Sequence, residues 1–402
     1  MRNQKQSKDT DRRTFLKNLG MLGTAGIIGT GIYNAAYGAG TSRKSNKPNK
    51  TPGIALVGLG KYASGQLAPA LQETKHCRLT GIVTGTPAKE GQWMEKYNIP
   101  GKNVYNYDNF DSIADNDDID IIYIVLPNSM HAEYSIRAAK AGKHVICEKP
   151  MTTTVEDAKA IIKACNDNNV KLSLGYRLHF EPHNLRAMEL GQEEKMGKVL
   201  DTDAEFSFVL NSKSWRLDKE MAGGGPLVDI GIYTIQGACY TKGQWPVEVE
   251  ARYGEVTKPD LFDSVEQSIS FTLKYPDGTT STHNTSYADK VNYLKTTAEN
   301  GWWEISPAYS YSNISGETSE GQMNFPNVNQ QARQMDAFAL SLINDTPILV
   351  TGDMGLRDMI IMEAIYKAAD TGKSVPLELD NLDIPLFDLH KKVNEKVKTS
   401  MS

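Results

Sequence analysis

The hydrophobic and polar positions follow two different patterns along the sequence. Between residues 53 and 175, short apolar runs alternate with amphipathic stretches of about ten residues or more. The apolar runs predict strands within residues 53–58, 78–83, 104–107, 119–127, 143–150 and 171–176. Helices are predicted from about Ser64, around Glu90 to Tyr97, from His131 and from Val155. Strands separated by such helices pair in parallel, so we expect an α/β domain with helices on both faces of the sheet.

From about residue 176 the pattern changes to longer β-rich runs. These lie at residues 199–210, 264–288 and 293–306, and Pro276-Asp277-Gly278 predicts a hairpin turn inside the second. Their imperfect alternation fits an antiparallel sheet that is covered on one face. Helical patterns at residues 329–342 and 353–369 are expected to pack back against the first domain.

The composition fits this two-domain organisation. The chain has 402 residues, of which 40% are hydrophobic and 23% are charged, as expected of a globular protein. We place the first domain at residues 53–175, the second at 176–376 and a C-terminal tail at 377–402.

The N-terminus has the pattern of an export signal. DRRTFLK at residues 11–17 precedes a mildly apolar, glycine-interrupted run from Leu19 to about Tyr37. This pattern predicts a twin-arginine signal peptide over residues 1–39, and therefore the twin-arginine machinery as a partner and a periplasmic location without a stable membrane anchor. The alternatives are an uncleaved anchor and a chance arginine pair. The polar, basic residues 40–52 predict a flexible arm.

Charge and cysteine content exclude other classes of function. Residues 1–39 carry six basic and two acidic side chains, so their removal changes the net charge from −5 to −9. A protein this acidic is a poor nucleic-acid binder. The four cysteines show no spacing typical of metal ligands, and we expect buried free thiols and no metal site.

The turn after the first predicted strand has the spacing of a dinucleotide site. Gly58, Gly60 and Ala63 match GxGxxA, and Lys61 and Tyr62 lie between them. The first glycine allows a sharp turn, the second leaves room for pyrophosphate, and the alanine allows close contact of helix and strand. The N-terminus of the following helix would supply N–H donors to the anion.

The end of the second strand bears on the choice between NADP and NAD. An NAD-selective site would place Asp or Glu there to bind the ribose 2′-hydroxyl. The sequence instead offers Thr84, Thr86 and Lys89, which suit a 2′-phosphate and favour NADP. NAD stays possible if Lys89 is only a solvated helix residue.

Two further blocks resemble a known family. VLPNSMHAE (125–133) and AGKHVICEKPMTT (141–153) are similar to the glucose-fructose oxidoreductase, inositol dehydrogenase and rhizopine-catabolism (Gfo/Idh/MocA) superfamily, over residues 53–376. GYR (175–177), SWRL (214–217) and AGGGPLVDIGIY (222–233) resemble its glucose-fructose oxidoreductase branch. The resemblance implies an N-terminal Rossmann dinucleotide-binding domain plus a C-terminal α+β domain with a large, mostly antiparallel open sheet. Many members carry His where this chain has Tyr233, which puts an inositol dehydrogenase activity in doubt.

The candidate catalytic residues are Lys149, Asp229 and Tyr233. Lys149 follows a strand of the parallel sheet, at the edge where ligands of this fold bind, and a cationic nicotinamide beside it should lower its proton affinity. Asp229 and Tyr233 are four residues apart on a predicted helix and therefore share a face. Asp229 would orient the substrate and Tyr233 would take the proton of the oxidised hydroxyl. The alternative for Tyr233 is core packing.

The remaining candidates follow from position or from the resemblance. The cofactor-binding set contains the turn and strand-end residues already named. It also contains Leu126, Pro127, Asn128, His131, Glu148, Lys149, Arg177, Trp215 and Arg216. The substrate set comprises Lys149, Tyr176, His179, Asp229, Tyr233 and Tyr287. Tyr176, Arg177, His179 and Tyr287 could equally be interior polar packing.

Export in folded form would carry a bound nucleotide out of the cytoplasm. We expect tightly bound NADP(H) that is returned to its starting state in each turnover. The first hypothesis is an oxidoreductase that oxidises an aldose to a lactone and reduces a ketose or second aldose in ping-pong order. The second is a redox-neutral lyase, glycosidase or epimerase that oxidises a sugar transiently, and the third is a non-catalytic sugar binder. A homodimer or homotetramer is expected, because the open sheet needs a cover.

Overall fold

The computed structural model describes residues 51–379 and 381–401. The predicted signal peptide and all but the last two residues of the predicted arm lie outside these residues. Residues 46–402 group into one unit, and its described residues form two sheets.

The first sheet is parallel and has the strand order β3-β2-β1-β4-β5-β6. This order is typical of dinucleotide-binding domains, in which the ligand lies outside the carboxyl ends of the central strands. The strands are β1 (Gly53–Val57), β2 (Arg78–Val83), β3 (Val104–Tyr105), β4 (Ile121–Ile124), β5 (His144–Cys147) and β6 (Leu172–Leu174). Each lies within a predicted run.

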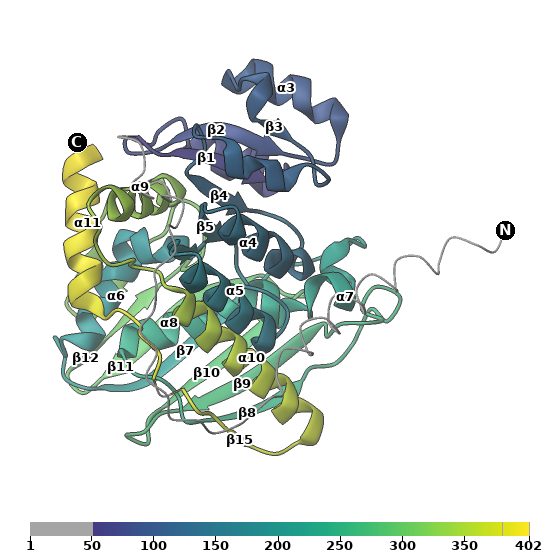
Figure 1. The fold of residues 1–402 in the computed structure, drawn as a ribbon. Helices are drawn as coiled ribbons and strands as arrows, with labels where there is room; N and C mark the ends of the chain where they lie inside the picture. Colours follow the sequence, from purple (N-terminus) through teal and green to yellow (C-terminus); the bar gives the residue numbers. More distant parts are fainter. Residues whose placement is uncertain (1–50, 380, 402) are drawn as a thin grey trace, which may run out of the picture. The chain divides into compact units, whose positions relative to one another are not determined.

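Helices cover both faces of this sheet, as expected from the alternating pattern (Figure 1). The helix after the glycine turn begins as a π-helix, where a longer α-helix was expected. The helical segments are η1 (Ala63–Leu67, π), α2 (Ala68–Ala70), α3 (Pro87–Tyr97), α4 (His131–Lys140) and α5 (Val155–Asp167), with 3-10 turns η2 (Gly101–Asn103), η3 (Phe110–Asp115) and η4 (Asn128–Met130).

The second sheet is large and mostly antiparallel, as expected. Its order is β14-β13-β12-β11-β7-β10-β9-β8-β15, and β7 and β10 form its parallel pair. The strands are β7 (Val199–Ser207), β8 (Glu248–Tyr253), β9 (Ser268–Lys274), β10 (Thr280–Ser286), β11 (Val291–Ala298), β12 (Gly301–Ile305), β13 (Gly316–Thr318), β14 (Gly321–Met323) and β15 (Val375–Pro376). Along β9, buried positions alternate with partly exposed ones, so one face of the sheet carries the core. The expected hairpin turn joins β9 to β10.

The remaining helices belong to the C-terminal half. They are η5 (Arg177–Phe180, 3-10), α6 (Pro182–Gln192), η6 (Trp215–Leu217, 3-10), α7 (Lys219–Ala222), η7 (Leu227–Gly231, π), α8 (Ile232–Lys242), α9 (Gln330–Ile343), α10 (Gly352–Thr371) and α11 (Phe387–Met401). None of the described helices is long and apolar enough to cross a membrane.

Two of these helices connect the halves of the chain. Buried side chains of α9, such as Met335 and Phe338, share a core with Ile54 and Ile121 of the parallel sheet. Helix α10 contacts both α5 and β8 (Figure 1). The predicted packing of both helices against the first domain is therefore confirmed.

The segment expected to be a C-terminal tail contains helix α11. It packs against α6 and α9, and its buried positions include Phe387, His390, Asn394 and Val397. This spacing of three and four residues is that of an amphipathic helix face. The domain boundaries themselves stay predictions.

Candidate functional site

The glycine turn after β1 has the geometry that a bound pyrophosphate requires. Gly58 has φ +93°, and a Cβ atom there would lie 2.5 Å from the carbonyl oxygen of Val125. At Gly60, by contrast, a Cβ would meet no atom within 4 Å. The first glycine is therefore required by the fold, whereas the space beside the second is open to a ligand.

Lys89 reaches this turn from helix α3. Its Nζ donates a hydrogen bond to the carbonyl of Leu59 at 2.7 Å. The Thr84 hydroxyl is buried and accepts from the backbone N–H of Thr86 at 3.2 Å. A cation beside the turn, with no acidic side chain contributed by residues 84–89, fits a 2′-phosphate. The turn and its surroundings therefore fit NADP(H), which Gly58, Gly60 and Lys89 would hold.

The residues after β4 use their polar atoms to join loops. The two ring nitrogens of His131 lie 2.8 Å from the carbonyl oxygens of Pro150 and Leu126. The Asn128 side chain donates to the carbonyl of Ala222 at 2.8 Å. These contacts place the lysine-bearing loop next to the loop after β4, and they tie the first domain to the end of α7.

Glu148 anchors the end of β5. Its carboxylate accepts from the Tyr123 hydroxyl at 2.8 Å and from the backbone N–H of Lys149 at 3.2 Å. A Cβ at Gly175 would lie 2.4 Å from this carboxylate, so Gly175 makes room for it. Burial raises the pKa of Glu148 above its ordinary value.

Lys149 lies at the centre of the site, as expected for its position after β5. Its Nζ donates to the backbone carbonyl of Asp229 and to Asp229 Oδ1, the latter at 3.2 Å. Burial lowers the pKa of Lys149, but the negative charges of Asp229 and Glu148 outweigh burial and the pKa lies above its ordinary value. The lower proton affinity expected beside a cationic nicotinamide stays a prediction, because in the protein without nucleotide the carboxylate partner determines the direction of the shift.

Asp229 has two partners besides Lys149. Arg216 Nε donates to Asp229 Oδ2 at 3.1 Å, and the Tyr287 hydroxyl donates to the same oxygen at 2.9 Å. Burial raises the pKa of Asp229, but Lys149 and Arg216 outweigh it and hold the pKa below its usual range. The guanidinium carbon of Arg216 also lies over the Trp215 ring, 4.7 Å from its centroid. Tyr287, predicted to contact the sugar, orients this carboxylate.

Two cations lie near the ring of Tyr233. Lys149 Nζ is 5.1 Å from the centroid of its ring, and the Arg177 guanidinium carbon is 5.2 Å from the same centroid. The first part of the predicted helix is a π-helix, and both Asp229 and Tyr233 still contact Lys149. The sequence prediction that these three residues lie together holds in the structure, and their catalytic roles stay predictions.

Arg177 is a support for the site. Its guanidinium donates to the carbonyls of Ser310 and Tyr309, at 2.9 and 2.6 Å, and to the side chain of Gln330. The two terminal nitrogens are thus occupied, whereas the buried Nε has no hydrogen-bond partner among the described residues. The prediction that Arg177 binds the nucleotide stays a prediction.

Tyr311 is a site residue that the sequence analysis missed. Its ring lies 4.4 Å from the Arg177 guanidinium and 6.0 Å from the ring of Tyr62, which precedes η1. Burial raises the pKa of Tyr311 to about 12. Nothing in the local sequence marks Tyr311, because it reaches the site from the loop after β12.

Tyr176 and His179 lie in the interior, which corrects their prediction as sugar contacts. Each is 1% exposed, and their rings stack on each other with centroids 6.1 Å apart. His179 also stacks on His390 of α11 at 4.9 Å. Helix α11, which the sequence analysis did not assign, covers this region.

The described residues hold no group of three His, Cys, Asp or Glu side chains placed to bind a metal ion. All four cysteines are buried and free in the described part of the chain, which confirms the expectation of buried thiols.

Two family descriptions match most of the folded chain. Residues 53–176 match the oxidoreductase family with an NAD-binding Rossmann fold, and residues 184–305 match the GFO/IDH/MocA C-terminal domain.

Individual relatives are also similar over most of their length. A crystal structure of aldose-aldose oxidoreductase from Caulobacter crescentus, complexed with glycerol, is 39% identical, covers 81% of this chain and 100% of its own, and superposes with a TM-score of 0.80. D-xylose 1-dehydrogenase [NADP(+)] of Haloarcula marismortui is 28% identical over 81% of this chain and 93% of its own. D-glucoside 3-dehydrogenase of Escherichia coli is 24% identical over 81% of this chain and 97% of its own.

Proposed function

The chain belongs to the GFO/IDH/MocA oxidoreductase family, and from this premise we propose that it is a sugar oxidoreductase that oxidises an aldose at C1 with bound NADP(H). The observation that carries the proposal is the cluster of Lys149, Asp229 and Tyr233 at the carboxyl edge of the parallel sheet. Similarity to an aldose-aldose oxidoreductase and to an NADP-dependent xylose dehydrogenase supports the substrate class.

The bound nicotinamide would supply a hydride acceptor next to Lys149. Oxidation of a C1 hydroxyl to a lactone removes a hydride from carbon and a proton from oxygen. Tyr233 takes that proton as the phenolate, and it becomes a phenolate again when it gives the proton up in the second half-reaction. Lys149 and Arg177 stabilise the Tyr233 phenolate before the proton transfer, and Lys149 stabilises the negative charge that develops on the sugar oxygen in the transition state. Asp229 holds Lys149 in place and neutralises its charge in the resting protein.

Reduction of a second sugar would complete the cycle. A carbonyl compound, either a second aldose or a ketose, receives the hydride at carbon and the proton from Tyr233. Each half-reaction then leaves the nucleotide bound, which gives ping-pong kinetics. Together with the twin-arginine pattern of residues 11–17, this cycle supports a periplasmic enzyme that retains its NADP(H).

Oxidation at C3 of a glycoside is the second candidate function. The similarity to D-glucoside 3-dehydrogenase favours it. The same tyrosine and lysine would then serve a ring hydroxyl, and the 3-keto sugar could pass into elimination or epimerisation before the hydride returns.

Product analysis separates the two candidates. Purified protein is incubated with glucose plus fructose, and with glucose plus xylose, without added nucleotide. Lactone and sugar alcohol in equal amounts support C1 oxidation with carbonyl reduction. A 3-keto product from a methyl glucoside, with neither lactone nor sugar alcohol from the free sugars, supports the second candidate. Absence of any product overturns both.

A further inference from the structure

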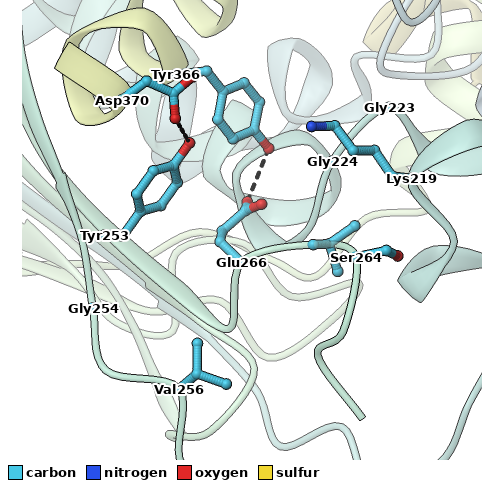
Figure 2. Close-up of a pocket in the computed structure, with 11 residues that line it drawn as sticks. Lys219, Gly223, Gly224, Tyr253, Gly254, Val256, Ser264, Glu266, Tyr366 and Asp370 are labelled. Carbon is cyan, nitrogen blue, oxygen red and sulfur yellow. Dashed lines mark hydrogen bonds between the residues drawn. The ribbon is translucent and has the colours of Figure 1, made fainter. Parts of the chain in front are cut away.

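The segment that carries Asp229 is bounded on its other side by a cavity of about 440 Å³. Figure 2 shows Gly223 and Gly224 on one wall, Glu266 and Tyr366 beside them, and Tyr253 with Asp370 on another wall. The Tyr366 hydroxyl donates to Glu266 at 2.9 Å. Tyr366 and Glu266 are therefore paired with each other. Glu266 also contacts the backbone of the glycine segment.

Glu266 binds the backbone where the π-helix η7 begins. One carboxylate oxygen accepts from the N–H of Gly225 at 3.0 Å, and the other accepts from the N–H of Leu227 at 3.1 Å. The first N–H groups of a helix have no partner within the helix, so an acceptor from outside must fix them. The carbonyl of Gly225 in turn accepts from the N–H of Asp229 at 3.3 Å. Glu266 and the backbone of Asp229 therefore both bind Gly225, the first at its N–H and the second at its carbonyl.

The consecutive glycines make this approach possible. A Cβ at Gly224 would lie 2.0 Å from the Tyr366 hydroxyl oxygen, and a Cβ at Gly225 would lie 2.9 Å from the carboxyl carbon of Glu266. Both φ values lie outside the left-handed region, so these two glycines serve space and not backbone conformation. Gly224 and Gly225 thus allow the Tyr366 phenol and Glu266 to lie against the backbone, whereas Gly223 has φ +85° and ends α7.

We propose that Glu266 is a positioning residue, which fixes the start of η7 so that both the carbonyl and the carboxylate of Asp229 face Lys149. The inference rests on the proposed function, in which Lys149 and Tyr233 act on the sugar hydroxyl. Glu266 contacts neither Lys149 nor Tyr233 directly and acts through Gly225 and Leu227.

The substitution Glu266→Gln tests this role, because its amide keeps the shape but replaces one acceptor oxygen with a donor. Misplaced catalytic groups lose rate steeply, and we expect kcat to fall by about 10-fold or more, with nucleotide content unchanged. Tyr366→Phe keeps both backbone bonds, so kcat should change little. Asp370→Asn is the matched control: it alters the other carboxylate and tyrosine pair of the cavity and should leave kcat at the wild-type value.

Titration of Lys149 gives a readout that does not depend on turnover. NMR of 15N-labelled lysine side chains, assigned with Lys149→Met, should show a lower pKa of Lys149 in Glu266→Gln, because Asp229 compensates its charge less well. Glu148, Tyr233 and Tyr311, which also face Lys149, are the same in both proteins.

The two readouts separate failure of this inference from failure of the proposed function. An unchanged kcat together with an unchanged Lys149 titration in Glu266→Gln overturns the positioning role, as does a lower melting temperature with an unchanged titration. A wild-type protein that turns over no sugar overturns the proposed function, while the Lys149 titration still decides the role of Glu266.

Discussion

At the scale of single residues, the site is a cluster of opposite charges around one phenol. Lys149 and Arg177 both lie near the Tyr233 ring, and Asp229 is held by Lys149, Arg216 and Tyr287. Because these groups are largely buried, removal of one charged partner leaves the other without compensation. Removal of any one member should therefore have a clear effect on rate or on stability.

Tyr233→Phe should abolish proton transfer and preserve the fold. Loss of a general acid-base group typically lowers the rate by about 10²–10⁴-fold, and we expect kcat to fall within that range. The ring still packs against Phe206 and Tyr309, so the melting temperature and nucleotide content should stay near wild type. Tyr309→Phe is the control, because it removes a buried hydroxyl without a partner from the neighbouring ring. Full activity of Tyr233→Phe would contradict the proposed proton transfer.

Asp229→Asn should destabilise the protein in a pH-dependent manner. It leaves the Lys149 ammonium without its counter-charge, which typically costs about 3–5 kcal/mol of unfolding free energy near neutral pH. Because the pKa of Asp229 is lowered, its contribution is present above about pH 4 and is lost as the pH falls through the folded pKa. The pKa of Lys149 is raised, so its contribution to the free energy of unfolding is fully present below about pH 10.5. This contribution is lost as the pH rises through the folded pKa.

Denaturant unfolding at several pH values measures this difference between wild type and Asp229→Asn. The exposed pair of Asp263 and Lys213 offers a control, and Asp263→Asn should produce no measurable change. A difference for Asp229→Asn that grows as the pH falls below 4 would show that the pair does not carry this stability.

Lys89 should decide the choice of nucleotide. Its Nζ lies at the glycine turn, where it can neutralise a 2′-phosphate. Loss of a charge-assisted hydrogen bond is worth about 1.5–3 kcal/mol, so Lys89→Ala should lower the preference for NADP over NAD by about 10-fold or more. Lys96→Ala, on an exposed position of the same helix, should not change the preference. An unchanged preference in Lys89→Ala would show that Lys89 does not bind the 2′-phosphate.

At the scale of elements, the two glycines of the turn after β1 serve different purposes. Gly58→Ala places a Cβ 2.5 Å from a backbone oxygen at a positive φ, and we expect misfolding or strong destabilisation. Gly60→Ala meets no atom of the protein within 4 Å and should fold with wild-type stability, yet bind nucleotide about 10-fold more weakly or worse, because the methyl group occupies the space of the pyrophosphate. Equal nucleotide affinity in wild type and Gly60→Ala, measured by calorimetry, would place the nucleotide elsewhere.

The elements that the sequence predicts well are those with local signals. The strands of the first domain follow from short apolar runs between helical stretches, and the glycine turn and Lys149 follow from motifs at strand ends. Helix α11 was missed because its buried face includes His390 and Asn394, which carry no apolar signal. That omission explains the error at His179, which α11 covers.

Other parts of the site depend on contacts between distant segments. Tyr311 and Glu266 reach the site from loops of the second domain, and their roles depend on the pairing of strands far apart in sequence. The raised pKa of Lys149 likewise depends on Asp229, which η7 presents from the second domain. Sequence motifs gave the identity of the central residues, whereas their electrostatic environment follows from the tertiary structure.

At the scale of the whole molecule, the two domains share their supports. Helix α9 of the C-terminal half packs on the nucleotide-binding sheet, and Asn128 ties the loop after β4 to the end of α7. The nucleotide turn and the Asp229 segment therefore belong to one packed unit, as retention of a cofactor would require. Dimerisation through the open face of the large sheet, where Leu200 is 47% exposed, stays a prediction.

The central claim is that the protein keeps NADP(H) bound and passes hydride through it from one sugar to another. The direct measurement is to denature the purified protein and identify the nucleotide released, after recording the absorbance of the intact protein with each sugar in turn. We predict one NADP(H) per chain, with reduced nicotinamide appearing when an aldose is added and disappearing when a second carbonyl sugar follows. A protein that is free of nucleotide, yet fully active once NAD is added to the medium, would contradict this account.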